Sequence, residues 1–120
     1  MRVSDAIAMF DKYAGESADS GLKYHWLQLI EDTIYSEIIL THNGGIERPP
    51  HVLEGDRELI CPDAYADLYI HFLNMQNDIF LRDTQGFQNS AAAFAAAYSD
   101  YADWYNRNNI PVSLNEVCIV

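Results

Sequence analysis

Residues 87–105, FQNSAAAFAAAYSDYADWY, carry the most regular apolar pattern of the chain and decide its fold class. Aromatic side chains recur three, four or seven residues apart, as they do on one face of a helix. They are Phe87, Phe94, Tyr98, Tyr101 and Tyr105. Many positions between them hold alanine, which has the highest helix propensity and lets neighbouring helices approach closely. The stretch predicts an α-helix over residues 86–107.

Three further helices are expected ahead of this one, over residues 5–14, 21–41 and 63–82. In the second, large apolar residues recur four residues apart and form a broad apolar face. They are Leu22, Trp26, Ile30, Ile34 and Ile38. The third keeps a three- and four-residue rhythm from Tyr65 to Ile79, so both of these residues are expected on its apolar face.

Turn and breaker residues set the ends of these helices. Ser4 is the expected N-cap of the first helix, because its hydroxyl can accept a hydrogen bond from an early backbone N–H. Pro49 and its neighbours break the pattern over residues 43–62, a loop long enough to be functional or ordered by a partner. Residues 109–120 are expected to form an extended tail. The prediction is one all-α domain over 1–120: a small four-helix bundle-like domain with a long central loop and an extended C-terminal tail.

Composition and charge limit the function further. The 120 residues are 49% hydrophobic and 21% charged, which is ordinary globular composition. The net charge of −11 argues against a nucleic-acid-binding face, which needs clustered lysine and arginine, and it suits a basic partner. No apolar run approaches the ~20 residues of a membrane span, and no secretory signal pattern opens the chain. Cys61 and Cys118 are therefore expected to be reduced thiols in a cytoplasmic protein.

Residues that could carry chemistry are sparse. The chain contains no nucleophile motif, no glycine-rich phosphate loop and no H-E-x-x-H metal motif. His42 and His51, with Glu47 and Glu54, make the only histidine and carboxylate cluster, and surface histidines are the commoner explanation. Two carboxylate pairs are expected to be solvated charges on helix faces: Asp63 with Asp67, and Asp100 with Asp103. The sequence predicts no enzyme, no cofactor and no metal site.

Three groups of residues are candidates for contacts with other proteins. The first is the charged loop, with Glu47, Glu54, Asp56 and Arg57, which is either solvated or docks a basic partner. The second is Trp104 and Tyr105, which either belong to the core or anchor an interface. The third is the apolar end of the tail, which packs on its own domain or on a neighbour. Its residues are Val117, Ile119 and Val120.

Three parts of the chain resemble small prophage-encoded head–tail connectors of Gram-positive tailed phages, also called head-completion or adaptor proteins. The first is residues 27–42, LQLIEDTIYSEIILTH. The second is ICPDAY at 60–65 with LYIHFL at 68–73. The third is FQNS at 87–90, followed by Phe94, Tyr98 and ADWYNR at 102–107. The matching residues are mostly aromatic and apolar, and their order and spacing are similar over most of the chain.

That resemblance implies a small helical bundle that joins the portal to the tail. Its implied partners are the portal and tail-side phage proteins, with copies of the chain forming a homo-oligomeric ring. The implied location is the host cytoplasm during assembly and then the virion neck. The net charge of −11 supports an alternative: a small acidic regulator or inhibitor that binds a basic host or phage protein.

Overall fold

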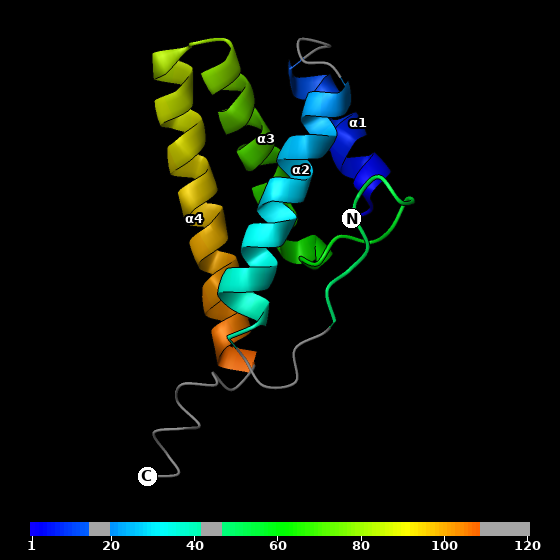
Figure 1. The fold of residues 1–120 in the computed structure, drawn as a ribbon. Coiled ribbons are helices and arrows are strands. Elements are labelled where there is room, and N and C mark those ends of the chain that lie inside the picture. The colour runs from blue at the N-terminus through cyan, green and yellow to red at the C-terminus, as the bar shows by residue number, and fades with distance from the viewer. Residues whose placement is uncertain (15–19, 42–46, 109–120) are drawn as a thin grey trace.

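The computed structural model describes residues 1–14, 20–41 and 47–108. Within these residues the chain contains four α-helices and no β-strand, so the predicted all-α class is confirmed (Figure 1). The single extended pairing in this part is an isolated antiparallel bridge between Arg2 and Glu58. The expected tail, residues 109–120, lies outside the described residues.

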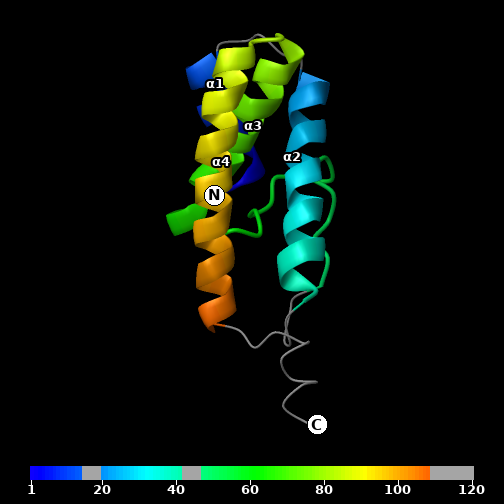
Figure 2. The ribbon, with the colours of Figure 1, turned by 90° about the vertical axis from the view of Figure 1, so that its left-hand side faces the viewer.

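The two C-terminal helices form an antiparallel hairpin. α3 (Asp67–Phe80) and α4 (Thr84–Asn108) lie side by side in Figures 1 and 2. Phe72 on α3 contacts Phe94 on α4, with 5.2 Å between the ring centroids. Interdigitating aromatic and alanine side chains explain the close approach of the two helices. α4 begins two residues earlier than residue 86, the start predicted from its apolar pattern.

The helix expected over 21–41 consists of two parts. α2 (Ser20–Ile34) continues into a π-helical turn, η1 (Tyr35–Ile39), in which the Leu40 N–H donates to the Tyr35 carbonyl at 2.9 Å. Inside the helix the Ser36 hydroxyl donates to the Asp32 carbonyl at 2.7 Å. Such a bond competes with the backbone ladder and bends helices. The widened turn brings consecutive apolar residues, Ile38 and Ile39, into the core together.

The first helix begins earlier than expected, and the prediction for its cap was wrong. α1 (Val3–Ala14) already contains Ser4, whose backbone N–H and hydroxyl both donate to the Asp56 carboxylate at 3.0 and 2.8 Å. The Val3 N–H donates to the Arg57 carbonyl at 3.0 Å. The central loop therefore caps this helix, so local sequence could not reveal the true cap.

The described part of the central loop packs onto its own domain. Val52, Leu59 and Cys61 are buried, and the Leu59 N–H donates to the Met1 carbonyl at 2.9 Å. A 3-10 turn, η2 (Asp63–Tyr65), then leads into α3. The helix expected over 63–82 is thus a short 3-10 turn followed by a shorter α-helix.

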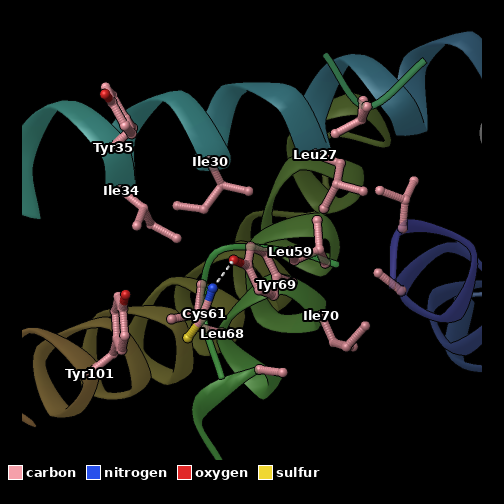
Figure 3. Packing of buried hydrophobic residues seen from close by; sticks show 14 of the residues in the cluster. Leu27, Ile30, Ile34, Tyr35, Leu59, Cys61, Leu68, Tyr69, Ile70 and Tyr101 are labelled. Carbon is pink, nitrogen blue, oxygen red and sulfur yellow. Dashed lines mark hydrogen bonds between the residues drawn. The ribbon is translucent and has the colours of Figure 1, made fainter. Parts of the chain in front are cut away.

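The main core lies where α2, the central loop, α3 and α4 meet (Figure 3). Leu27, Ile30 and Ile34 enter it from α2, Leu68 and Tyr69 from α3, and Tyr101 from α4. A smaller cluster joins α1, α2 and α3 through Phe10, Trp26 and Leu73. Each of these apolar side chains contributes on the order of 1.5–3 kcal/mol on full burial. The core fixes both the hairpin and the loop against α2.

Candidate protein-binding surfaces

The turn between α3 and α4 exposes three consecutive apolar side chains, which we call the apolar tip. Ile79, Phe80 and Leu81 keep 51%, 52% and 53% of their surfaces exposed. The turn lies at the upper end of the hairpin in Figure 1. Isolated exposed apolar residues are ordinary on protein surfaces, but contiguous ones mark contact sites. The apolar tip is therefore a candidate protein-binding surface.

Hydrogen bonds hold the backbone of this turn. The Arg82 N–H donates to the Ile79 carbonyl at 3.1 Å, and the Asp83 N–H to the Asp78 carbonyl at 2.9 Å. These two bonds form a Schellman motif. Arg82 has φ of 59°, the left-handed conformation in which glycine usually ends a helix. Asp83 then caps α4, because its Oδ1 accepts the Gly86 N–H at 3.0 Å.

One of the tip residues, Ile79, faces away from the core for a geometric reason. The buried face of α3 includes Tyr69, Leu73 and Asn77. Ile79 lies two residues beyond Asn77, roughly 200° around the helix, so it points outward. The expectation that Ile79 joins the apolar face was wrong. Phe80 keeps a partial contact with the domain through an edge-on approach to Trp26, with 6.4 Å between the ring centroids.

The charged loop divides into inward and outward residues. Arg57 is directed inward and forms a salt bridge of 2.8 Å with Glu31 of α2. Asp56 binds the first turn of α1, and its bonds from Ser4 lower the pKa of its carboxyl group. Glu47 and Glu54 are exposed. Of the four loop residues predicted to contact a partner, Arg57 and Asp56 are thus engaged within their own domain.

Glu31 is the centre of a buried polar network. Only 2% of its surface is exposed, and its Oε1 accepts Arg57 at 2.8 Å and the Ile60 N–H at 3.2 Å. Its Oε2 accepts the Tyr69 hydroxyl at 2.8 Å. The Tyr69 oxygen in turn accepts the Cys61 N–H at 2.9 Å, which is the dashed line in Figure 3. Each partner in this network is satisfied, as buried polar groups require.

The ionisable groups of this network are unsuited to nucleophilic chemistry. Burial, followed by the nearby Glu31 charge, raises the pKa of the Cys61 thiol to about 12. The same two causes raise the pKa of Tyr69 well above its ordinary value. A thiol of this kind stays protonated, whereas a reactive cysteine needs an accessible thiolate. The network therefore has the character of a structural anchor for the loop.

The aromatic residues near the end of α4 pack against η2. The Trp104 ring lies 5.5 Å from the Tyr65 ring and 6.0 Å from the Tyr101 ring. The Tyr105 ring lies 6.1 Å from that of Tyr101. Tyr101 is fully buried, while Trp104 and Tyr105 keep part of their surfaces exposed. Both alternatives from the sequence retain support, because these rings cover the core and also remain accessible to a partner.

The described residues also contain a groove between α3 and α4. Alanines of α4 line it, together with Asp67 of α3 and Asp100 of α4. His71 of α3 and Tyr65 of η2 also line it. The two aspartates were expected to be solvated helix-face charges, and the fold brings them into the lining of one groove.

The remaining predicted contact residues, Val117, Ile119 and Val120, lie outside the described residues. His42 of the loop histidine cluster also lies outside them. Among the residues that the structure does describe, no three histidine, cysteine or carboxylate side chains come together to hold a metal ion. Over the same residues, no helix combines the length and the hydropathy needed to cross a bilayer.

Sequence reasoning missed the apolar tip and the groove. The run Ile79-Phe80-Leu81 was visible, and its position directly before a turn is a signal that at least one of the three must face outward. The groove had no local signal, because its two sides lie about thirty residues apart in the chain. Comparison of the chain with protein-family models, with curated protein sequences and with solved structures found no match.

Proposed function

We propose that this chain is a non-catalytic protein-binding component, and that the apolar tip is one of its contact surfaces. The observation that carries the proposal is the half-exposed state of Ile79, Phe80 and Leu81 on a turn fixed by hydrogen bonds from both helices. A contact surface held in one conformation loses little conformational entropy when it binds. The burial of the Cys61 thiol and of Tyr69 supports the absence of a catalytic role for them.

The specific role that we propose is that of a phage head–tail connector. It rests on the resemblance of residues 27–42, 60–73 and 87–107 to prophage connectors. In this role the apolar tip contacts the portal, a tail-side protein or the next copy in a homo-oligomeric ring. A ring requires contacts between two different surfaces of each copy, so a tip at one end of the hairpin is a suitable half of such a contact.

Electron microscopy of an induced lysate tests this role. A strain that lacks this gene is expected to produce DNA-filled or leaking heads and separate finished tails. Complementation with the wild-type gene restores joined particles, and complementation with Ile79→Ser/Leu81→Ser does not. Asn89→Ser, an exposed change on α4, serves as the matched control and restores joining. Normal particles from the deletion strain would rule out the connector role.

A purified Ile79→Ser/Leu81→Ser protein shows whether loss of joining is a folding artefact. Both residues are about half exposed, so the helical circular dichroism and the unfolding midpoint are expected to stay near those of the wild type. A well-folded double variant that restores joined particles would exclude the apolar tip as a contact surface while leaving the connector role intact.

A second candidate function is an acidic regulator that occupies a basic surface of a host or phage protein. The observation that favours it is the net charge of −11, together with the pairing of four of the seven basic side chains with carboxylates of the same chain. Such binding weakens steeply with salt. An assembled connector, held by apolar contacts, is expected to tolerate the same salt.

A further inference from the structure

The groove between α3 and α4 has the shape and chemistry of a side-chain binding site. It has a volume of about 390 Å³, within the ~300–1,000 Å³ range of binding clefts. Ala93, Ala96 and Ala97 line it at the spacing of one helix face. Their methyl groups leave room that larger side chains would fill, and they offer an apolar surface to an aliphatic stem.

Two carboxylates without internal partners, one from α3 and one from α4, line this groove. Asp67 and Asp100 line the groove, and neither has a salt bridge or a side-chain hydrogen bond within the described part of the chain. This contrasts with Asp56, whose carboxylate is occupied by Ser4. Among the described residues, His71 is the one histidine in the lining, and no lysine or arginine lines the groove to pair with the two carboxylates.

An aromatic side chain also lines the groove. Tyr65 lines it and is backed by Trp104, with 5.5 Å between their ring centroids. A guanidinium group stacks on such rings and also binds carboxylates with two parallel hydrogen bonds, whereas an ammonium group does neither as well. A metal ion is a poorer fit, because no three ligand side chains come together in the described residues.

A different protein suits the site better than a second copy of this chain, because most basic side chains of the chain are already paired. Four of its seven basic side chains already pair with its own carboxylates: Arg2, Lys23, Arg48 and Arg57. The other three lie far apart in the sequence, at Lys12, Arg82 and Arg107. Nucleic acid is excluded by the negative charge on the groove.

A second hollow, with a volume of about 760 Å³, does not select a partner by charge. It lies beside α1 and is lined by Arg2 and Lys12 together with Asp5 and Glu58. Arg2 and Glu58 lie 3.7 Å apart and compensate each other. The groove between α3 and α4 is therefore the better-defined site.

We propose that the groove between α3 and α4 binds an arginine-bearing segment of a partner protein. The aliphatic stem of the arginine lies on Ala93, Ala96 and Ala97. Its guanidinium group lies between Asp67 and Asp100, with a face toward Tyr65. The inference rests on the proposed protein-binding function, but it concerns a surface separate from the apolar tip.

Nuclear magnetic resonance titration with a synthetic peptide tests the proposal. The probe is an alanine-rich helix with arginines spaced four residues apart, and the matched probe carries lysine in their place. Addition of the arginine peptide to the ¹⁵N-labelled full chain is expected to shift the amide signals of Ala93, Ala97 and Asp100 most. Shifts centred on Glu47 and Glu54, or equal affinity for the lysine peptide, would overturn it.

A pair of charge-matched double variants separates site binding from general attraction. Asp67→Asn/Asp100→Asn is expected to weaken binding of the arginine peptide about tenfold or more, as loss of charge-assisted hydrogen bonds does. Glu47→Gln/Glu54→Gln removes the same charge from the loop and is expected to change affinity less than about twofold. Equal weakening by the two would overturn the proposal.

Failure of this inference can be distinguished from failure of the proposed function. The Ile79→Ser/Leu81→Ser variant retains the groove and is expected to bind the arginine peptide with wild-type affinity. The groove variant retains the tip. If only the tip variant loses particle joining, and the groove variant also binds the peptide normally, the protein-binding function stands and the groove assignment is wrong.

Discussion

The central loop and the groove between α3 and α4 are both rich in acidic residues, yet their charges have different roles. In the loop segment, Arg57 reaches the buried Glu31 and Asp56 binds the start of α1. In the groove, Asp67 and Asp100 have no side-chain partner among the described residues. The sign of a charge in the sequence is therefore a poor guide to its role, because burial and partners decide it. Arg57 and Asp56 of the loop stabilise this fold, whereas the groove carboxylates are available to another molecule.

The largest expected effect follows removal of the Glu31 carboxylate, the centre of the buried polar network that anchors the loop. Glu31→Ala leaves Arg57, the Ile60 N–H and the Tyr69 hydroxyl without their acceptor in a buried site. Removal of one member of a buried ion pair costs about 3–5 kcal/mol. We expect the free energy of unfolding, measured by urea titration with circular dichroism, to fall by this amount.

Glu54→Ala is the control for the charge itself, because Glu54 is exposed in the same loop. It is expected to change the unfolding free energy by no more than about 0.5 kcal/mol. In a double-mutant cycle, Glu31→Ala with Arg57→Ala is expected to cost less than the sum of the single changes. Additive costs would show that the two residues do not act as a pair.

The second effect concerns the hydroxyl group that links the loop to α3. Tyr69→Phe keeps the ring but leaves the buried Cys61 N–H without an acceptor. An unsatisfied buried donor costs about 1–3 kcal/mol. Tyr98→Phe is the comparison, because it removes a hydroxyl that bonds the exposed Glu37. Thermal unfolding is expected to show a clearly larger loss for Tyr69→Phe, and equal losses would contradict the anchoring role of the network.

A smaller effect is expected at the loop contact with α1. Asp56→Ala removes the acceptor for the Ser4 N–H and hydroxyl, and should lower the unfolding midpoint more than the charge-matched Glu54→Ala. The folded-state pKa of Asp56 lies below its ordinary value of 3.8. Its stabilisation is therefore present above that pH and is lost as the pH falls through the lowered pKa. The difference between wild type and variant should shrink on acidification, as thermal melts over a pH series would show.

The smallest effect on stability belongs to the groove. Asp67→Asn/Asp100→Asn breaks no internal contact, so the unfolding free energy is expected to stay within about 0.5 kcal/mol of the wild-type value. The same urea titration measures it. A larger loss would mean that these carboxylates support the fold, and the contrast with the loop would then disappear.

Periodic patterns predicted the helices well, and contacts between distant residues explain the rest. The aromatic spacing from Phe87 to Tyr105 correctly indicated α4, because a long amphipathic helix depends on local order. The stabilising role of the loop could not be predicted from the sequence, because the Glu31–Arg57 pair joins residues that are far apart in the chain. Likewise, Asp56 replaced Ser4 as the cap of α1 from a distant position.

The candidate contact residues follow the same rule. Glu47 and Glu54 are exposed as expected, and the inward direction of Arg57 depends on a carboxylate on another helix. The three- and four-residue rhythm continued to Ile79, so this residue was predicted to lie on the apolar face. In the structure the buried face of α3 ends with Asn77 and does not include Ile79. A periodic sequence defines a face, but only the packed neighbours decide which side of it meets the core.

The capping of α1 by the central loop has a consequence for the order of folding. The Val3 and Ser4 N–H groups are bonded only after the Arg57 carbonyl and the Asp56 carboxylate have packed against them. These acceptors lie more than fifty residues later in the chain. Contacts so distant in sequence carry a high entropy of loop closure and form late. The hairpin of α3 and α4 relies on near neighbours and can form first. The beginning of the chain is thus completed near the end of folding, and its amides are expected to exchange with solvent deuterium sooner than those of the hairpin.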